Sequence, residues 1–177
     1  QKHIKRVFLE PADPMPVEDA LQAIDAADVI LLGPGSLYTS LIPNLLVKDM
    51  ADHIRASAAL KVYICNVMTQ PGETDGFSAS DHLRVVLDHA GAGVVQYCLL
   101  NNGRVPAQAA ARYREQGAHA VTVDTAEIRA LGVIPVLRPL INENDLVRHH
   151  PVKLADAVME VVSRGNKGWP RIHRSRR

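Results

Sequence analysis

Short apolar runs recur along the chain and alternate with segments in which apolar side chains lie three or four residues apart. The runs predict buried strands, and the spaced segments predict amphipathic helices. The expected strands are residues 7–9, 28–32, 61–66, 94–100, 120–123 and 133–137. The expected helices are residues 17–26, 36–47 with a break at Pro43, 49–58, 80–89, 106–115, 125–131 and 151–162. This alternation predicts a doubly wound α/β fold with a mostly parallel sheet and right-handed crossovers.

Length and composition favour one folded domain followed by a basic tail. The chain has 177 residues, of which 47% are hydrophobic, and this is enough for one substantial core. We place the domain at residues 1–163 and a flexible tail at residues 164–177, which hold six Lys or Arg and no acidic residue. The formal net charge of the whole chain is +1, which is less than the six positive charges of the tail. The domain itself is therefore acidic and does not resemble a nucleic-acid-binding surface. The tail is either a solvated end or a contact for an anionic lipid, a nucleic acid or an acidic partner.

Cysteine usage and the lack of long apolar runs favour a cytoplasmic location. Cys65 and Cys98 lie inside apolar runs, which predicts buried free thiols and no disulfide framework. No run approaches the roughly 18 consecutive apolar residues of a membrane helix, and the first residues do not resemble a signal peptide. The chain begins without Met and without a glycine-rich strand-to-helix unit, so we expect it to be the back half of a longer fold.

The first candidate site follows the predicted strand 28–32 and comprises Gly33, Pro34, Gly35 and Ser36, then Tyr38, Thr39 and Ser40. Ligands of open parallel sheets bind beyond the carboxyl ends of the strands. The glycines would let the backbone approach a ligand, and a helix that begins near Ser36 would aim its N–H groups at an anion. An equally open interpretation is a tight turn in which Ser36 only caps the helix.

The second candidate site follows the predicted strand 61–66 and is unusually long and polar. It carries amide, hydroxyl and carboxylate side chains at Asn66, Thr69, Gln70, Glu73, Thr74 and Asp75, with Gly72 and Gly76 for sharp turns. Amides and hydroxyls can bind a base, a ribose or a sugar, and carboxylates can accept from a ribose or hold a metal. A solvated surface loop is the alternative, although loops of this length in compact domains are usually functional or disordered.

Other polar residues give weaker signals. His82, at the start of the helix 80–89, could orient a phosphate or act as an acid or base, or it could hold a structural hydrogen bond. The turn Asn101-Asn102-Gly103 follows another predicted strand and either lines the same crevice or is a plain turn. No spacing around the eight histidines predicts a zinc site.

Two long motifs carry a resemblance to a known family. Residues 33–40, with Pro43-Asn44-Leu45-Leu46, and residues 65–76, with Ser80-Asp81-His82, closely resemble the YvcK-like gluconeogenesis factors of the CofD superfamily, which also contains 2-phospho-L-lactate transferase. Segments 4–9, 132–133 and 146–149 are also similar to that family, so the resemblance runs from about residue 4 to residue 162. It implies a Rossmann-like, CofD-like fold in a cytoplasmic bacterial protein that supports cell shape and cell-wall precursor supply during growth on gluconeogenic carbon sources.

The resemblance also implies a ligand and a set of contacts. The regulatory branch binds UDP-activated sugars such as UDP-N-acetylglucosamine, and this chain is more similar to that branch. The predicted nucleotide-binding residues are Gly33, Pro34, Gly35, Ser36, Tyr38, Thr39, Ser40, Asn44, Asn66, Thr69, Gln70, Gly72, Glu73, Thr74, Asp75 and His82. We expect no protein-bound metal and no required cofactor, although Mg²⁺ can accompany a nucleotide diphosphate. The expected partners are the nucleotide diphosphate, the missing first half of the fold and a second copy of the chain, without membrane or specific nucleic acid.

The chain departs from the family pattern at its beginning. The family's glycine-rich first turn and its Asp-Asp-Gly-Gly and Gly-His-Ser segments are absent, so half of the nucleotide crevice should be missing. Phe77 stands where relatives often have tyrosine, and the arginine-rich tail lies outside the similarity. The leading hypothesis is a non-catalytic nucleotide-sugar-binding regulator. The alternative is a transferase that moves a phospholactyl group from a guanosine diphosphate carrier to a deazaflavin, with metal on the diphosphate and His82 or Asp75 in proton transfer.

Overall fold

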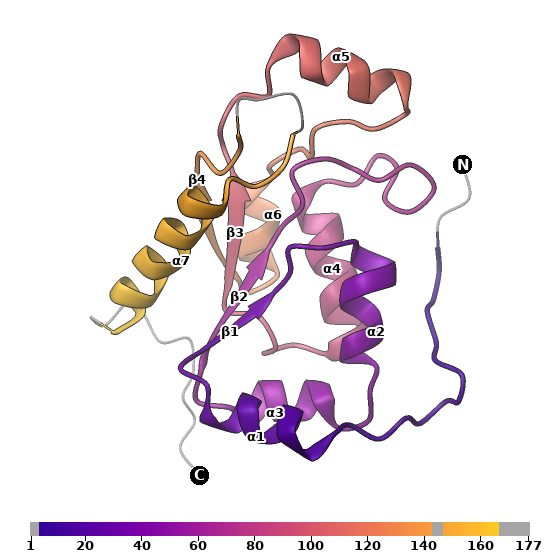
Figure 1. Cartoon of the computed structure of the whole chain (residues 1–177), viewed down its shortest axis with the longest axis vertical. Helices are drawn as coiled ribbons and strands as arrows, with labels where there is room; N and C mark the ends of the chain where they lie inside the picture. The colour runs from indigo at the N-terminus through magenta and orange to yellow at the C-terminus, as the bar shows by residue number, and fades with distance from the viewer. Residues whose placement is uncertain (1–3, 143–146, 167–177) are drawn as a thin grey trace.

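A four-stranded sheet lies at the centre of the computed structural model, which describes residues 4–142 and 147–166 (Figure 1). The strands are β1 (Val29–Leu32), β2 (Leu60–Ile64), β3 (Tyr97–Asn101) and β4 (Ile134–Arg138), in the order β1-β2-β3-β4. Each strand pairs in parallel with the next one along the chain. The predicted α/β fold with a parallel sheet is therefore confirmed.

The helices alternate with the strands, as the apolar spacing predicts. They are α1 (Glu18–Ala26), η1 (Leu37–Leu41), α2 (Ile42–Leu45), α3 (Met50–Ala56), α4 (Ala79–Ala90), α5 (Ala107–Glu115), α6 (Thr125–Ala130) and α7 (Pro151–Asn166). η1 is a turn of π-helix that leads directly into α2. Pro43 lies in the first turn of α2, where a missing N–H leaves no hydrogen bond unmade, so the predicted break at this proline is confirmed.

The two faces of the sheet are covered by different helices. On one face, side chains of β1–β3 such as Leu32, Tyr63 and Cys98 pack in a large core with η1, α2, α3, α4 and α6. On the other face, β2, β3 and β4 pack against α7, which buries Val158 and Val161 there. A consecutive strand order places the crossover helices on one face, so α7 is the element that covers the second face (Figure 1).

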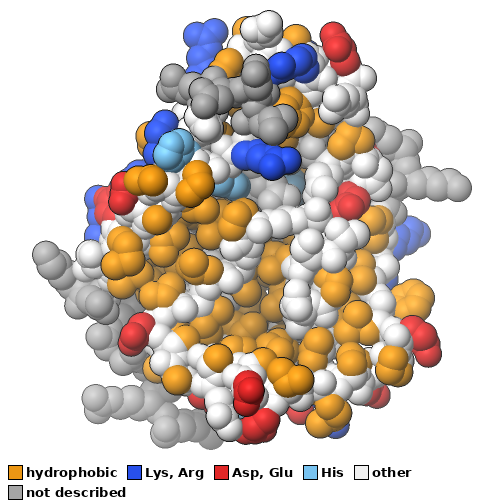
Figure 2. Space-filling model, viewed as in Figure 1, with side chains coloured by type: hydrophobic (Ala, Val, Ile, Leu, Met, Phe, Trp, Pro, Cys, Tyr) orange, Lys and Arg blue, Asp and Glu red, His pale blue; other side chains and the backbone are white. Residues whose placement is uncertain are grey.

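The second face is covered only in part. Leu31, on β1, is 46% exposed, and the outer edge of β1 has no neighbouring strand within the described ranges. Figure 2 shows hydrophobic side chains gathered over the middle of the molecule in this view. Because apolar side chains on a buried parallel strand are normally covered on both faces, β1 has the composition of an interior strand in an edge position.

Two of the six expected strands are wrong. Residues 7–9 are extended but unpaired, because Val7 packs against the core from a segment that runs outside the sheet. Residues 120–123 form only isolated bridges, in which Ala120 pairs with Met68 and Thr122 pairs with Ser78. Both segments have strand-like composition, but neither lies beside an extended strand with which it could form a continuous series of hydrogen bonds. Helix α7 extends to Asn166, and the rest of the predicted basic tail lies outside the described residues.

Candidate functional site

The two candidate segments lie at the same edge of the sheet and touch each other. The first turn (residues 33–40) follows β1 and the second turn (residues 66–78) follows β2, which pairs in parallel with β1. The side-chain Nε2 of Gln70 donates a hydrogen bond of 2.9 Å to Oγ of Ser36. This contact joins the two turns across the tips of neighbouring strands. The expectation that both turns emerge at one edge is therefore confirmed.

The two glycines of the first turn have different structural roles. Gly33 has φ +88°, and a Cβ atom built on it would lie 3.0 Å from the carbonyl oxygen of Ile64 in β2. Only glycine fits this position without strain. Gly35 is exposed and has no positive φ, and a Cβ atom there would make an ordinary 3.4 Å contact with Cβ of Ser40. Gly33 is thus required by the fold, whereas the fold tolerates a side chain at Gly35.

The first turn leaves backbone donors without acceptors. The N–H groups of Ser40 and Leu41 both donate to the carbonyl oxygen of Ser36, at 3.0 Å. The N–H groups of the three residues between them and Ser36 have no acceptor among the described residues. Leu37 and Tyr38 are buried and anchor the turn, so these donors are held in place. A turn with fixed, unpaired N–H groups beside a serine hydroxyl suits an anionic oxygen.

Most polar side chains of the second turn hold the turn itself together. Oγ1 of Thr74 accepts from the N–H of Gln70 at 2.8 Å, and Oγ1 of Thr69 accepts from the N–H of His119 at 2.9 Å. Oδ2 of Asp75 accepts from the N–H of Gly72 at 2.7 Å. Thr69 and Thr74 are also buried. These hydroxyl groups fix the path of the backbone and face away from solvent.

Other predicted residues of this edge remain available to a ligand. Pro34, Thr39, Ser40 and Asn44 are exposed, and Nδ2 of Asn44 donates to the carbonyl oxygen of Ser40. Asn66, Gln70 and Glu73 are half-buried. Oε1 of Gln70 and Oε2 of Glu73 are buried atoms without a hydrogen bond to any described residue. The structure therefore separates the predicted set into groups that face the edge and groups that shape it.

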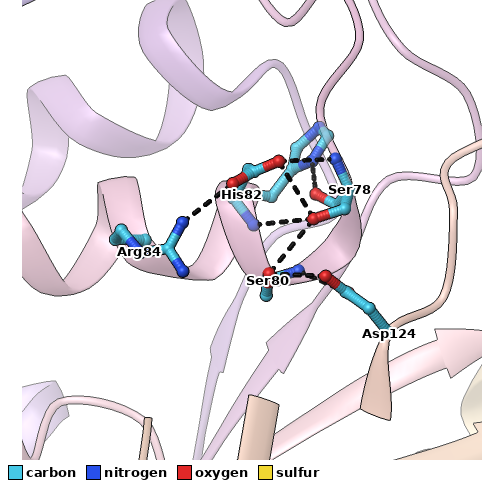
Figure 3. A network of polar contacts seen from close by, with 6 residues as sticks. Ser78, Ser80, His82, Arg84 and Asp124 are labelled. Carbon is cyan, nitrogen blue, oxygen red and sulfur yellow. Dashed lines mark hydrogen bonds and ion pairs between the residues drawn. The ribbon is translucent and has the colours of Figure 1, made fainter. Parts of the chain in front are cut away.

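The N-terminus of α4 is already occupied by carboxylates (Figure 3). Ser78 and Asp81 form a capping box, in which each side chain accepts from the backbone N–H of the other residue. The N–H and hydroxyl groups of Ser80 donate to Asp124, which precedes α6. Burial raises the pKa of Asp124, but hydrogen bonds from Ser80 and Ser78 outweigh it and hold that pKa below the ordinary value. A phosphate here would face two carboxylates, so this helix end does not suit an anion.

His82 lies in the core and is fully buried. Its Nδ1–H donates to the carbonyl oxygen of Ser78 at 2.8 Å, and its ring meets the edge of Phe77 with centroids 5.4 Å apart. Burial lowers the pKa of His82, in spite of the hydrogen bond to Ser78, so the ring is neutral at pH 7. Nε2 is buried and has no partner among the described residues. This geometry favours the structural interpretation of His82.

A cavity lies next to the second turn, and the predicted turn Asn101-Asn102-Gly103 lines it together with Asn66. It has a volume of about 350 Å³ and lies between the carboxyl ends of β2 and β3. Its lining comprises Cys65, Asn66, Val67, Leu100, Asn101, Asn102, Gly103, Val105, Ala110, Ala120, Val121 and Val123. The sequence predicted this turn at the sheet edge, but the contribution of residues 120–123 to the same lining depends on tertiary structure. We call this cavity the amide pocket.

Two further properties concern metals and membranes. Within residues 4–142 and 147–166, no group of three or more His, Cys, Asp and Glu side chains could hold a metal ion. No helix in the same ranges is both long enough and apolar enough to cross a membrane.

Cys65 and Cys98 are free and buried, as predicted, and burial raises the pKa of the Cys65 thiol to about 12. These thiols are therefore protonated at pH 7.

With this geometry in view, comparison with known proteins identifies the family. Residues 1–141 match the family of 2-phospho-L-lactate transferase CofD. The chain belongs to this CofD family. It is 48% identical over 160 residues to the gluconeogenesis factor of Halalkalibacterium halodurans, and this match covers 90% of this chain and 50% of that protein. It is 38% identical over 162 residues to the gluconeogenesis factor of Bacillus subtilis, and this match covers 91% of this chain and 51% of that protein.

A solved structure agrees with the fold of this CofD-family chain. The crystal structure of a UPF0052 family protein from Bacillus halodurans is 47% identical, with a TM-score of 0.86 over 89% of this chain and 51% of that chain. The resemblance predicted from the two turns is therefore confirmed, and so is the Rossmann-like α/β class. The chain spans about half the length of the curated relatives it matches.

Proposed function

We propose that this CofD-family chain is part of a gluconeogenesis factor that binds a nucleotide sugar of the UDP-N-acetylglucosamine type. In this proposal the binding regulates cell-wall precursor supply and cell shape in the cytoplasm, and the chain does no chemistry on the ligand. The observation that carries it is the 2.9 Å contact between Gln70 and Ser36, which joins the two polar turns at one sheet edge. The names of the relatives support the gluconeogenic role.

The first turn is the proposed diphosphate site. Its support is the exposed backbone of Gly35, the hydroxyl of Ser36 and the N–H groups of residues 37–39, which have no acceptor among the described residues. Such donors favour the extra negative charge of a diphosphate over a neutral sugar. The second turn would then contact the sugar or base through Gln70 and Glu73, which have unpartnered buried oxygens. Any Mg²⁺ at this site would be bound to the diphosphate of the ligand.

Calorimetric titration with UDP-N-acetylglucosamine tests the proposal. We expect measurable heat at high micromolar ligand, and at least tenfold weaker binding after Ser36→Ala, because a charge-assisted hydrogen bond is lost. Ser163→Ala is the matched control, since its hydroxyl donates to the carbonyl oxygen of Met159 on α7, remote from this edge. No heat with the unmodified chain, or equal affinities for both variants, would count against the assignment.

We further propose that the open edge of β1 receives the other half of the family fold. The support is the lack of a strand beside β1 in the described ranges and the double length of the relatives, together with the 46% exposure of Leu31 on the partly covered face of that strand. Co-purification with a polypeptide equivalent to the first half of a relative tests this. We expect a stable 1:1 complex that Leu31→Glu prevents, whereas Val152→Glu, at an exposed position of α7, leaves it intact.

The alternative is a transferase of the phospholactate type, which the family description favours. Within the described ranges, no group of three or more His, Cys, Asp and Glu side chains could hold a metal ion, and burial keeps His82 neutral. Mass spectrometry after incubation with a guanosine diphosphate phospholactate donor and a deazaflavin separates the two hypotheses. Formation of the phospholactyl deazaflavin would establish the transferase, and its absence with retained UDP-sugar binding would favour the regulator.

A further inference from the structure

Helix α7 lies on the second face of the sheet and has two flanks of opposite character. Its inward side chains, among them Val158 and Val161, pack against β2, β3 and β4. On the side of β4, the guanidinium group of Arg138 donates two hydrogen bonds to the carboxylate of Glu160. Arg164, one helical turn further on, forms an ion pair with the same carboxylate. Charged groups therefore close the flank of α7 that faces β4.

The opposite flank of α7 is apolar and uncovered by any described residue. Successive residues of an α-helix are about 100° apart, so Ala155 and Val162 project on the side of α7 opposite Glu160. Met159 lies between them along the helix and is 61% exposed. Ala155 is also exposed, and Val162 is half-buried. Because the strand order is β1-β2-β3-β4, this flank faces β1.

Leu31 extends the same apolar surface onto the sheet. Val29, two residues before it on β1, packs with the α7 cluster, and side chains two residues apart on a strand share a face. Leu31 is therefore on the α7 side of the sheet, and it is 46% exposed. Figure 2 shows hydrophobic side chains gathered over the region in which Figure 1 draws α7 and β1. We call Leu31, Ala155, Met159 and Val162 the apolar flank.

The spacing of helices and strands indicates what would cover the apolar flank. Packed helices lie about 8–10 Å apart, and neighbouring strands lie about 4.8 Å apart. A helix packed beside α7 is therefore displaced from it by about two strands. Because α7 packs over β2, β3 and β4, it is centred on β3, and the strand two places toward the open edge is β1. A second helix on this face would thus lie over Leu31.

The two edge strands differ in the same direction. The N–H of Ile134 in β4 donates to Gln96, so the nitrogen of the next residue, Pro135, faces the outer edge. Proline has no N–H to offer to a further strand and is typical of a sheet edge. β1 (Val29–Leu32) contains no proline. A polypeptide that extends the sheet would therefore join it at β1, next to the apolar flank.

We infer that the apolar flank receives an amphipathic helix from the other half of the family fold, which lies beside α7 and across β1. Such a helix presents apolar side chains three and four residues apart, the spacing that relates Ala155, Met159 and Val162 on α7. The chain matches about half the length of its relatives, and the remaining half supplies this helix. The inference rests on the proposed pairing of that half with β1 and adds a second contact surface.

Two equally exposed residues of α7 provide a matched test. Met159 and Val152 are both 61% exposed. Val152 lies in the first turn of α7, directly after His150, whose N–H donates to Leu140 beyond the end of β4, so it is not beside β1. In co-purification with the first half of a relative, we expect Met159→Glu to weaken the complex at least tenfold, because a charge would be buried. Val152→Glu should leave the complex unchanged, and unfolding curves check that both variants fold.

Cysteine protection locates the contact directly. The native Cys65 and Cys98 are buried, so a maleimide reagent reports on an introduced thiol. We expect the other half to slow the modification of Ala155→Cys at least tenfold and to leave the rate for Val152→Cys unchanged. Equal rates for Ala155→Cys with and without the other half would overturn the inference.

The outcomes separate this inference from the proposed function. A complex that Leu31→Glu prevents but Met159→Glu spares would overturn the helix contact and leave the pairing at β1 standing. No complex with the unmodified chain would overturn both, whereas nucleotide-sugar binding is decided by its own titration. Sedimentation of the chain alone tests a second copy as the occupant. A dimer that Met159→Glu converts to a monomer would assign the apolar flank to that copy and overturn the inference.

Discussion

The two polar turns at the carboxyl edge look alike in sequence but differ in how they use their polar groups. The first turn leaves its backbone donors and the exposed Gly35 facing the edge. The second turn satisfies much of its polarity internally, through Thr69, Thr74 and Asp75. Polar composition therefore does not measure availability to a ligand. The comparison predicts that changes at these three residues of the second turn mainly reduce stability, whereas one change in the first turn reduces binding alone.

The largest expected effect is at Asp124, which holds the exit of the second turn. Asp124→Ala removes the acceptor of both donors of Ser80, a residue that is only 3% exposed. Two buried donors without partners should lower the free energy of unfolding by about 3 kcal/mol. Urea denaturation measures this, with Asp88→Ala, at an exposed position of α4, as the control. A loss equal to that of the control would show that the network is not structural.

The next effect is at Gly33, the glycine of the first turn that the fold requires. Gly33→Ala combines a positive φ with a 3.0 Å approach to the carbonyl oxygen of Ile64. We expect a loss of about 2 kcal/mol, typical of a strained backbone position. The melting temperature measured by circular dichroism should fall accordingly. Gly132→Ala is the control for conformation alone, because its φ is +79° but no atom lies within 4 Å of the added carbon.

A smaller loss should follow from Thr74, inside the second turn. Thr74→Val keeps the shape but leaves the N–H of Gln70 without its acceptor. The expected loss is about 1 kcal/mol, since one neutral hydrogen bond disappears. Because Gln70 also contacts Ser36, UDP-sugar affinity should fall modestly as the turn loosens. Thr125→Val is the control, because it makes the same substitution outside the second turn, at the start of α6. If Thr74→Val abolished binding without any loss of stability, the hydroxyl would be a ligand contact.

These differences mark what the sequence could and could not predict. The aliphatic runs at β1 and β2 and their glycine-rich ends were enough to place both turns at one edge. The partner of Ser80 is Asp124, which lies 44 residues away, so no local pattern could reveal that network. The same limit applies to residues 120–123, whose composition is strand-like but whose neighbour is an irregular turn. Apolar periodicity reports burial, whereas the use of each hydroxyl depends on which distant backbone group comes within reach.

The buried His82 predicts a pH dependence of stability. Its pKa is lowered by burial in the folded state, so the unfolded chain takes up a proton first when the pH falls below about 6.5. Stability should therefore decrease as the pH falls from 7 toward 5, and His82→Phe should flatten that slope. His149, whose pKa burial also lowers, contributes in the same direction and leaves a residual slope. Denaturant titrations at several pH values check this, and an unchanged slope in His82→Phe would contradict it.

The smallest expected change in stability is at Gly35, where the two turns differ most. An added Cβ atom meets only Cβ of Ser40, at 3.4 Å, and the backbone has no positive φ. Gly35→Ala should therefore change the free energy of unfolding by less than about 0.5 kcal/mol. The same methyl group would stand where a phosphate must approach the backbone, so UDP-sugar affinity should fall at least tenfold. A loss of binding without a loss of stability is a signature that Thr69, Thr74 and Asp75, which hold the second turn together, cannot produce. If Gly35→Ala binds normally, the first turn is a structural turn after all.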